Sequence, residues 1–397
     1  MKILLVQDAE WRKKGPHQQH HLMELLSLRG HEIMVIGFDQ YWREEKSAFI
    51  SKKIVVDDVC RFYKGAKVKF IRPWFIRFPV LDYISFLFSS RKEIKEQVKK
   101  FNPDVIIGFS SVLSNYWGMR YAKQNNIPYI YYWYDIVHIL NVPRKFSWLA
   151  KIIEKKIIKN SDSIIVINEV LKDYIINFGA DEKTTEVIPG GVDFKRFNPE
   201  KVDSTYFREK FGISDDDLVL FFMGWLYHFS GLKEVTLELS KIKETEPNIK
   251  LLIVGKGDAY DDIKKIIEAQ CLEDMVIMTG QMPYEDIPRL ISSADICLLP
   301  AYNNEIMRDI VPIKIYEYLA MHKPVIATAL MGVMKEFGVD NGVNYIDRPE
   351  DVIKKLNEFD DSAINKNKAM AGQFIQHYNW EKIITDFEDI LVKLVHI

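Results

Sequence analysis

The feature that most restricts the fold of this chain is a pair of successive series in which short apolar runs alternate with longer helical patterns. Runs that are apolar throughout, with helices between them, are typical of parallel strands covered on both faces. The polar, turn-rich stretch 194–216 separates the two series and indicates a new start. The expected strands of the first series are 2–7, 31–38, 104–110, 128–134, 162–168 and 185–193. Those of the second series are 218–224, 250–255, 275–280, 296–300, 324–328 and 343–346.

The chain has 397 residues, enough for two or three domains of about 150 residues each. We therefore predict an α/β protein with two Rossmann-like, doubly wound parallel-sheet domains. The first should span 1–194 and the second 217–375, joined by a linker at 195–216 and followed by a helical segment at 376–397. Ligands of such sheets bind beyond the carboxyl ends of the strands, so we expect the site in a cleft where the two sheets face each other.

Composition excludes several classes of protein. Lys plus Arg number 54 against 56 for Asp plus Glu, and the net charge of -2 gives no overall field for binding nucleic acid. Cys60, Cys271 and Cys297 are widely spaced, which argues against a disulfide framework or a cysteine zinc site. No stretch reaches the ~18 uncharged apolar residues of a membrane-spanning helix. We expect a cytoplasmic protein that is soluble or attached only peripherally to the inner face of a membrane.

The strongest motif is "ICLLPAYNNEIMRDIVPIKIYEYLAMHKPVIAT" at 296–328, where a strand is followed by a loop, a helix and another strand. Free backbone N–H groups at the start of that helix could hold a diphosphate, and Glu317 could accept hydrogen bonds from ribose hydroxyls. The alternative is a surface loop capped by Asp309, with Glu317 in solvent. The residues expected around the diphosphate are Val311, Pro312, Ile313 and Lys314.

This motif resembles the E-x7-E region of retaining glycosyltransferases of the GT-B fold, family 4, also called glycosyl transferases group 1. Residues 317–327, "EYLAMHKPVIA", are similar to the helix of that region, and the first acidic position falls on Asp309. The resemblance implies that Asp309 meets the donor sugar and Glu317 the ribose of a nucleoside diphosphate sugar. Here Asp stands where Glu is usual, and it is one methylene shorter.

The resemblance covers nearly the whole chain. Residues 161–199 are similar to the passage that leads into the interdomain segment, with Gly190 where Asn is usual. Residues 251–267 are similar to a glycine-containing strand–loop–helix, which implies that Gly255 and Gly257 bind the donor; a tight strand-to-helix turn is the alternative reading of both glycines. As in relatives, the last helix should pack back toward the first domain.

The sequence departs from the family in "MGWLYHFSGLKEV" at 223–235, where relatives carry an Arg and a Lys that contact the diphosphate. Trp225 stands near the Arg position and Ser230 near the Lys position, while Gly231 is retained. Gly224 and Gly231 are both expected donor contacts. The site is therefore either rearranged or has lost transfer activity. Three lysines could supply the missing charge, namely Lys233, Lys256 and Lys314, and the helix start favours Lys314.

The first half contributes expected acceptor-side residues. Gly15 lies where the family's glycine loop approaches the donor phosphates or the acceptor, and we expect His17 to contact the loop or the acceptor. His20 is expected on the helix surface. His17 and His21 share a helix face, a spacing found in metal sites, but no HExxH order or carboxylate partner follows, so no metal is expected.

The strand 128–134 ends where many relatives have a His-Asp pair beside the reacting sugar. Tyr134 takes the place of that His, and Asp135 follows it, so Asp135 is the better site candidate. His138, three residues further on, is either a second active-site residue or a structural histidine.

The segment 61–88 combines basic residues with aromatic ones and contains no acid before Asp82. Such a segment suits an anionic membrane surface or a lipid-linked acceptor. The alternative is a core strand and helix with basic flanks. Nucleic acid is disfavoured because no recognised binding motif accompanies the basic residues.

The resemblance implies a hexosyltransferase-type enzyme that moves a sugar from a nucleoside diphosphate sugar to a hydroxyl of a glycan, a lipid-linked or a small-molecule acceptor, with retained configuration. No cofactor and no metal are expected, because no DxD motif stands on a suitable loop. Two other readings stay open. One is a nucleotide-sugar epimerase or hydrolase on the same fold, and the other is a non-catalytic partner subunit.

Overall fold

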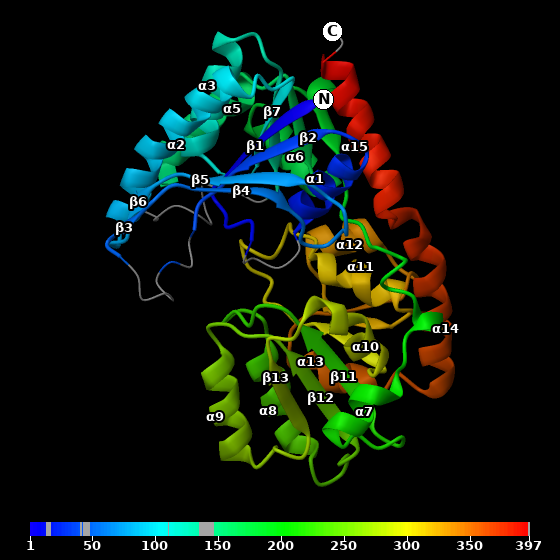
Figure 1. Ribbon diagram of the computed structural model, residues 1–397. Helices are drawn as coiled ribbons and strands as arrows, with labels where there is room; N and C mark the ends of the chain where they lie inside the picture. The colour runs from blue at the N-terminus through cyan, green and yellow to red at the C-terminus, as the bar shows by residue number, and fades with distance from the viewer. Residues whose placement is uncertain (13–16, 40–41, 43–47, 110, 135–146, 396–397) are drawn as a thin grey trace. The chain divides into compact units, whose positions relative to one another are not determined.

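The computed structural model of the chain describes residues 1–12, 17–39, 42, 48–109, 111–134 and 147–395. It divides into two compact units, coloured from blue to green and from green to orange in Figure 1, with the red last helix in the first unit. The first domain comprises Met1–Pro189 with Trp380–Ile397, and the second comprises Gly190–Asn379.

Within its described residues, the first domain contains an eight-stranded sheet in the order β10-β9-β8-β7-β1-β2-β5-β4. The strands run parallel apart from β4, which is antiparallel to β5. The strands are β1 (Lys2–Gln7), β2 (Glu32–Ile36), β4 (Ile54–Val59), β5 (Val68–Arg72), β7 (Val105–Phe109), β8 (Tyr129–Trp133), β9 (Ser163–Val166) and β10 (Thr185–Val187). Two short strands, β3 (Ile50–Ser51) and β6 (Phe75–Ile76), pair separately. The helices are α1 (Gln18–Leu28), α2 (Leu81–Lys100), α3 (Leu113–Gln124), α5 (Ser147–Lys159), α6 (Glu169–Phe178) and α15 (Trp380–Val395).

The second domain has a parallel sheet in the order β13-β12-β11-β14-β15-β16. Its strands are β11 (Leu218–Met223), β12 (Ile249–Val254), β13 (Val276–Gly280), β14 (Ile296–Leu299), β15 (Val325–Thr328) and β16 (Val343–Ile346). Its helices are α7 (Thr205–Phe211), α8 (Leu232–Ile242), α9 (Tyr260–Gln270), α10 (Ile287–Ser292), α11 (Ile313–Ala320), α12 (Met331–Phe337), α13 (Asp351–Leu356) and α14 (Asp361–Phe374).

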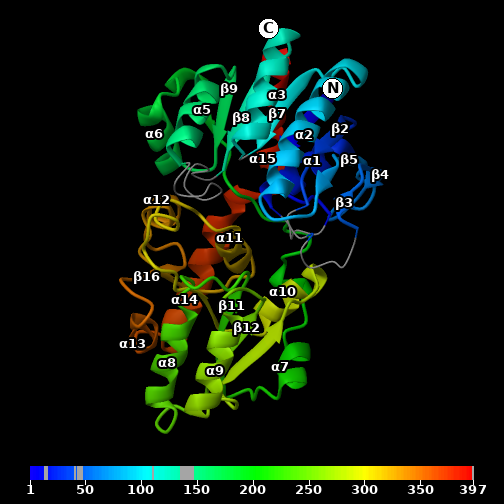
Figure 2. The same ribbon diagram turned by 90° about the vertical axis from the view of Figure 1, so that its left-hand side faces the viewer.

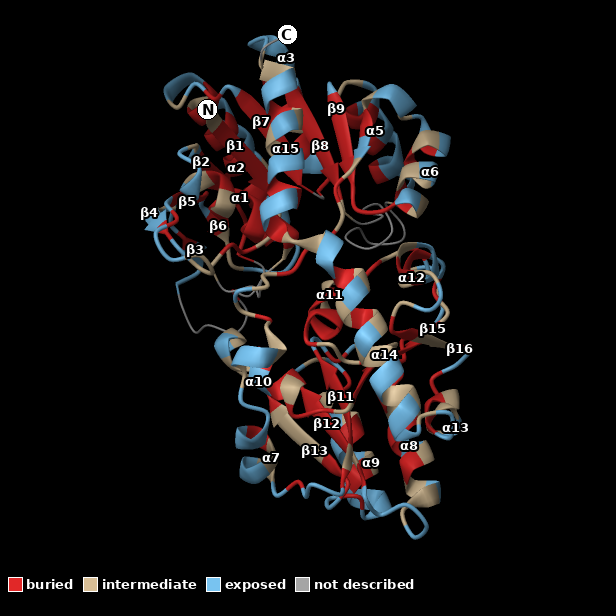
Figure 3. Cartoon of the chain, turned by 90° about the vertical axis from the view of Figure 1, so that its right-hand side faces the viewer, coloured by how far each residue is buried: buried red, intermediate tan, exposed pale blue. Residues whose placement is uncertain are grey.

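The two sheets confirm the predicted fold class. In each, the first strand lies inside the sheet, β1 between β7 and β2 and β11 between β12 and β14, so the strand order reverses beside it. The inner strands of both sheets are buried on both faces, as their unbroken apolar runs predict, whereas the edge strand β4 is largely exposed. The helices turn their exposed sides outward (Figure 3). The carboxyl ends of β1 and β11 are therefore where each sheet can take a ligand.

The domain boundary differs from the predicted one. The division lies at Pro189 rather than at residue 194, and the stretch 195–216, expected to be a linker, belongs to the second domain. This stretch is turn-rich, but two of its aromatic residues, Phe197 and Phe207, are fully buried in the core of the second domain. A polar segment with two buried rings folds with the domain that covers them.

The last helix, α15, packs on the first domain against α1. Arg29 and His31 both contact Glu388, at 2.6 Å from Arg29 Nη1 to Oε2 and 2.6 Å from His31 Nε2 to Oε1. At the start of the helix Trp380 stacks on His21, with 4.7 Å between the ring centres. Among the described helices, none combines the length and the apolar character needed to cross a membrane.

Candidate functional site

Two loops at the carboxyl edge of the second sheet fit together through glycine backbones. The N–H of Gly224, after β11, donates to the carbonyl of Val254 at 2.9 Å. Gly255, after β12, has φ 146°, and a Cβ there would lie 1.9 Å from the carbonyl oxygen of Gly224. A Cβ on Gly257 would lie 2.4 Å from the nitrogen of Leu226. Only glycines allow this contact, so Gly224, Gly255 and Gly257 form a side-chain-free floor, which we call the glycine floor.

Gly231 and Lys233 lie at the start of α8 and have other partners. A Cβ on Gly231 would lie 1.8 Å from the carbonyl oxygen of Pro300, so this glycine lets α8 begin against the end of β14. The ammonium of Lys233 contacts Asp262 of α9 at 2.5 Å. Lys233 was predicted to contact the donor, but its ammonium is held by α9 and does not lie at the glycine floor.

Lys314 reaches the glycine floor from α11. Pro312 caps this helix, and Ile313 is the first helical residue. The Nζ of Lys314 lies 4.0 Å from the ring centre of Phe222 and 2.8 Å from where a Cβ on Gly224 would be. Burial lowers the pKa of Lys314 to about 7, and the nearby carboxylate of Glu317 opposes this shift. The helix start thus presents a cation above a bare backbone surface.

Glu317 lies one turn after Lys314 on the same side of α11 and is 7% exposed. The hydroxyl of Tyr284, in a short 3-10 helix (Tyr284–Asp286), donates to its Oε1 at 2.8 Å. Burial raises the pKa of Glu317 to about 7, while the Tyr284 hydrogen bond, Lys314 and Arg196 act against the shift. Arg196 stacks on Tyr284, 4.7 Å from the ring centre. Glu317 is therefore a buried acceptor flanked by two cations, not a solvated surface residue.

Asp309 precedes α11 and is 4% exposed. Its neighbour Arg308 contacts both of its carboxylate oxygens, at 3.0 Å from Nε and 2.9 Å from Nη2. The backbone at Asp309 packs against α12, where a Cβ on Gly332 would lie 2.6 Å from the Asp309 carbonyl oxygen. The first acidic position of the motif is thus a fixed ion pair at the entrance to the helix.

The two positions where the family's cations are missing differ in environment. Trp225 is 46% exposed, and its indole N–H donates to Asp258 at 3.2 Å. Ser230 is buried, and its backbone N–H donates to the carbonyl of Tyr227. Lys256 is exposed. Of the three lysines that could supply the missing charge, namely Lys233, Lys256 and Lys314, it is Lys314 that lies over the glycine floor.

The acceptor-side predictions are only partly covered by the structure. Gly15, Asp135 and His138 lie outside the described residues. His17 caps α1, and its backbone N–H donates to Nδ1 of His20 at 3.2 Å. His20 is 1% exposed, with Nε2 3.0 Å from the carbonyl oxygen of Trp11, so the expectation that it lies on the surface is wrong. Among the described residues, no group of three or more His, Cys, Asp or Glu could hold a metal ion.

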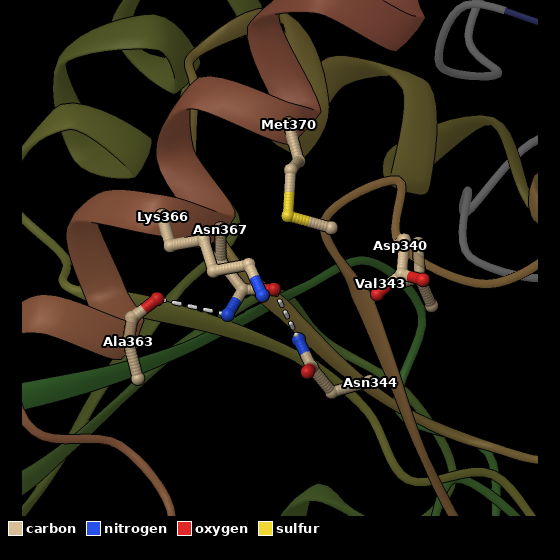
Figure 4. A pocket seen from close by; sticks show the side chains of 7 residues that line it. All are labelled: Asp340, Val343, Asn344, Ala363, Lys366, Asn367 and Met370. Carbon is tan, nitrogen blue, oxygen red and sulfur yellow. Dashed lines mark hydrogen bonds between the residues drawn. The ribbon is translucent and has the colours of Figure 1, made fainter.

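A pocket of about 190 Å³ lies elsewhere in the second domain, between β16 and α14 (Figure 4). Its amides form a chain in which Asn344 donates to Asn367 at 3.0 Å and Asn367 donates to the carbonyl of Ala363 at 2.9 Å. It contains none of the predicted site residues, and both of its amide nitrogens already donate to protein oxygens. The donor-site prediction therefore does not gain from it.

Tyr284 and Arg196 were not predicted. Both lie far from Glu317 in the sequence, and the turn-like stretch around Tyr284, "MPYEDIP", gives no indication of which helix it covers. The position of Gly190 is explained by the same helix α11, because a Cβ there would lie 2.8 Å from the ring of Tyr316. A bulky Tyr316 thus requires glycine where the family usually has Asn.

Solved structures show the same fold. Sucrose-phosphate synthase from Thermosynechococcus elongatus has a TM-score of 0.77 at 19% identity, covering 99% of this chain and 98% of that chain. The Anabaena protein HepE, solved in complex with UDP-glucose, has a TM-score of 0.72 at 16% identity, covering 99% of this chain and all of its own.

Curated relatives match only part of the chain. An uncharacterized glycosyltransferase of Methanocaldococcus jannaschii is 22% identical over 253 residues, 62% of each chain. The alpha-D-kanosaminyltransferase of Streptomyces kanamyceticus is 30% identical over 128 residues, 32% of each chain. The chain thus spans 62% of the length of the first relative and 32% of the length of the second.

Two family descriptions match successive parts of the chain. "Glycosyltransferase Family 4" matches residues 19–196 and "Glycosyl transferases group 1" matches residues 203–377. The second match contains the glycine floor, Lys314 and Glu317, and the first covers most of the first domain. With both matches in order and the GT-B architecture shared with the solved neighbours, the chain belongs to the family 4 (group 1) glycosyltransferases.

Proposed function

We propose that this protein transfers a hexose from a nucleoside diphosphate sugar to an acceptor hydroxyl, with retained configuration and without a metal. The observation that carries the proposal is the placement of Lys314 over the glycine floor, with the buried Glu317 one turn later on the same side of α11. Such a surface matches the two ends of a nucleoside diphosphate, since the cation suits the diphosphate and the carboxylate suits vicinal hydroxyls. That HepE was solved with UDP-glucose supports a nucleotide-sugar donor.

In this proposal the diphosphate lies on the glycine floor, where no side chain blocks its approach. Free N–H groups at the start of α11 and the Lys314 ammonium stabilise the charge that grows on the leaving diphosphate. The ribose hydroxyls donate to Glu317, which Tyr284 holds in place. Asp309, fixed by Arg308, would accept from a sugar hydroxyl. Roles of Gly15, His17, Asp135 and His138 toward the acceptor stay predictions.

The positions of Lys314 and Arg196 favour a rearranged site over a non-catalytic subunit, although the usual Arg and Lys are missing. Lys314 brings its charge to the floor from α11, and Arg196 adds a second positive charge beside Glu317. An epimerase or hydrolase would use the same donor contacts but would consume the donor without an acceptor. The exposed free thiols of Cys60 and Cys271 suit a reducing, cytoplasmic location.

Donor binding is the experiment that tests this function. UDP-, GDP- and ADP-sugars are titrated calorimetrically, and the thermal stability of the protein is followed in parallel, because a ligand of the native state stabilises it by mass action. We expect one base to bind, with donor turnover when acceptors are supplied. Failure of all three to bind the wild-type protein would support the non-catalytic reading, and turnover without any acceptor would support the hydrolase or epimerase.

Lys314 predicts proton uptake on nucleotide binding. Because its pKa is about 7, Lys314 is largely uncharged in the free protein at pH ~8, and a bound diphosphate favours the protonated form. Glu317, also near 7, is already ionised at that pH and takes up no proton. We therefore expect affinity to fall as pH rises above about 7, and uptake of close to one proton per nucleotide.

Calorimetry in two buffers of different ionisation enthalpy measures this uptake directly. The variant Lys314→Met should bind more weakly and take up no proton, while Lys256→Met, which removes an exposed lysine nearby, should behave like the wild type. Equal heats in both buffers for the wild-type protein would show that Lys314 is not the cation of the site.

A further inference from the structure

Three helices of the first domain form a continuous layer on one side of its sheet. Helix α3 packs between α2 and α5, and the three lie side by side in both Figure 1 and Figure 2. Helix α3 joins the parallel neighbours β7 and β8, and α5 joins the parallel neighbours β8 and β9. Helix α2 lies between β5 and β7, parallel strands of the same sheet that β1 and β2 separate, so all three helices begin at the carboxyl edge of the strands. Their exposed side chains form one surface, which we call the basic helical face.

Acidic side chains on these helices are turned inward. Asp82 and Glu93 of α2 are buried, the first accepting from the indole of Trp42 at 2.9 Å and the second contacting Lys53 at 2.7 Å. Glu154 of α5 is also buried and accepts from the Tyr131 hydroxyl and the Trp133 indole. Glu96, which contacts Lys100, is the remaining acid on the three described helices, and α3 has none.

Basic side chains point outward instead. They are exposed along all three helices, and they are Arg91, Lys92, Lys95, Lys99, Lys100, Arg120, Lys123, Lys151, Lys155, Lys156 and Lys159. Several lie over exposed or half-exposed rings, such as Arg91 over Trp117 at 4.1 Å. Since the whole chain has a net charge of -2, this positive surface is a local arrangement, and its complement is an anionic one.

The first turns of the same helices carry exposed apolar side chains. Phe88 is 67% exposed and Trp148 is 63% exposed, and both lie within two turns of a helix start. The apolar rim consists of Val80, Leu81, Ile84, Phe88, Leu113, Trp148, Leu149 and Ile152. The adjoining strands β3 and β6 extend it with Phe49, Ile50, Trp74 and Phe78. A basic surface with an apolar rim matches a bilayer, whose headgroups take the charges and whose acyl boundary takes the rings.

We propose that the basic helical face docks the protein on a membrane that contains anionic lipids, with the apolar rim inserted. Nucleic acid would satisfy the charges but would leave the large apolar side chains of the rim in water. The rim lies at the carboxyl edge of the sheet, the edge that takes ligands in such folds, so docking would present that edge to lipid-linked molecules. Within 61–88, the contact begins only at Trp74, because Val68, Phe70 and Ile71 are core residues.

Sedimentation with vesicles tests this proposal without any nucleotide sugar. The full chain should bind vesicles of phosphatidylcholine mixed with phosphatidylglycerol, and should bind pure phosphatidylcholine weakly. The variant Lys92→Glu/Lys95→Glu should bind the anionic vesicles at least about tenfold more weakly, since each lysine near an anionic surface contributes severalfold. Trp148→Ser/Ile152→Ser should lose binding to the mixed vesicles at unchanged charge.

Matched variants in the second domain show whether vesicle binding depends on the basic helical face or on the overall charge of the protein. Lys264→Glu/Lys265→Glu on α9 makes the same charge change, and Met331→Ser/Val339→Ser removes two exposed apolar side chains. Both should bind like the wild type, with thermal unfolding as the check that all variants fold. Equal loss in both charge variants would overturn the proposal. An absence of vesicle binding by the wild-type protein would also overturn it. The same holds if the protein binds an oligonucleotide instead of vesicles and Lys92→Glu/Lys95→Glu removes that binding.

Discussion

Replacing Glu317 with Ala should abolish measurable nucleotide binding while the protein stays folded. The carboxylate is buried and held by Tyr284, and no water can take its place as a charged acceptor for the ribose hydroxyls. Hydrogen bonds to a charged group contribute about 1.5–3 kcal/mol each, so losing two of them weakens binding by a factor of at least about 100. Calorimetric titration with the nucleotide that binds the wild-type protein measures the effect.

Glu336 offers a matched control for this substitution. It lies in the same domain and accepts from the Tyr316 hydroxyl at 2.8 Å, the same distance as between Tyr284 and Glu317. Glu336→Ala therefore removes a tyrosine-bonded carboxylate that we do not place in the donor site, and nucleotide affinity should stay within a few-fold of wild type. Similar losses in both variants would indicate that the carboxylates act on the fold rather than on the nucleotide.

Glu317 also makes the stability of the free protein depend on pH. Burial raises the pKa of Glu317 from 4.5 to about 7, so the native state holds a proton that the unfolded chain releases between these values. This carboxyl therefore makes the free protein lose stability as pH rises from about 4.5 to 7. Lys314 acts in the opposite direction above 7, where its lowered pKa makes stability rise with pH toward 10.5.

The fold could be predicted because it depends on local patterns. Runs such as 218–224 and 250–255 are apolar on both faces, which is typical of parallel strands covered by helices on both sides. The helix that holds Lys314 and Glu317 could be predicted for the same reason, since its proline and its spacing are local. The linker could not, because the burial of Phe197 and Phe207 depends on the domain that covers them.

The site was predicted less completely because its contacts join distant segments. Tyr284 meets Glu317 across 33 residues of sequence, and the salt bridge of Lys233 with Asp262 joins two helices. Nothing in either local sequence indicates the partner. His20 was misplaced for a related reason, because its burial comes from Trp11 and Phe62, not from its own helix.

The largest effect on stability is expected at the glycine floor. Gly255→Ala places a methyl group 1.9 Å from the carbonyl oxygen of Gly224, at a φ of 146° that side chains rarely adopt. Neither loop can move away easily, because the Gly255 N–H donates to the Gly280 carbonyl and the Gly224 N–H donates to Val254. We expect a loss of more than about 3 kcal/mol in unfolding free energy of the second domain, from strain and lost hydrogen bonds together.

Gly212→Ala separates the steric clash from the cost of a positive φ. Gly212 ends α7 in the same domain with φ 66°, and a Cβ there would meet no atom within 4 Å. Its substitution should therefore cost only about 1 kcal/mol, the usual cost of a left-handed residue with a side chain. Chemical denaturation followed by circular dichroism measures both losses. Equal losses for the two variants would mean that the loops are loose enough to admit a methyl group, and the glycines would then serve the turn rather than a floor for the diphosphate.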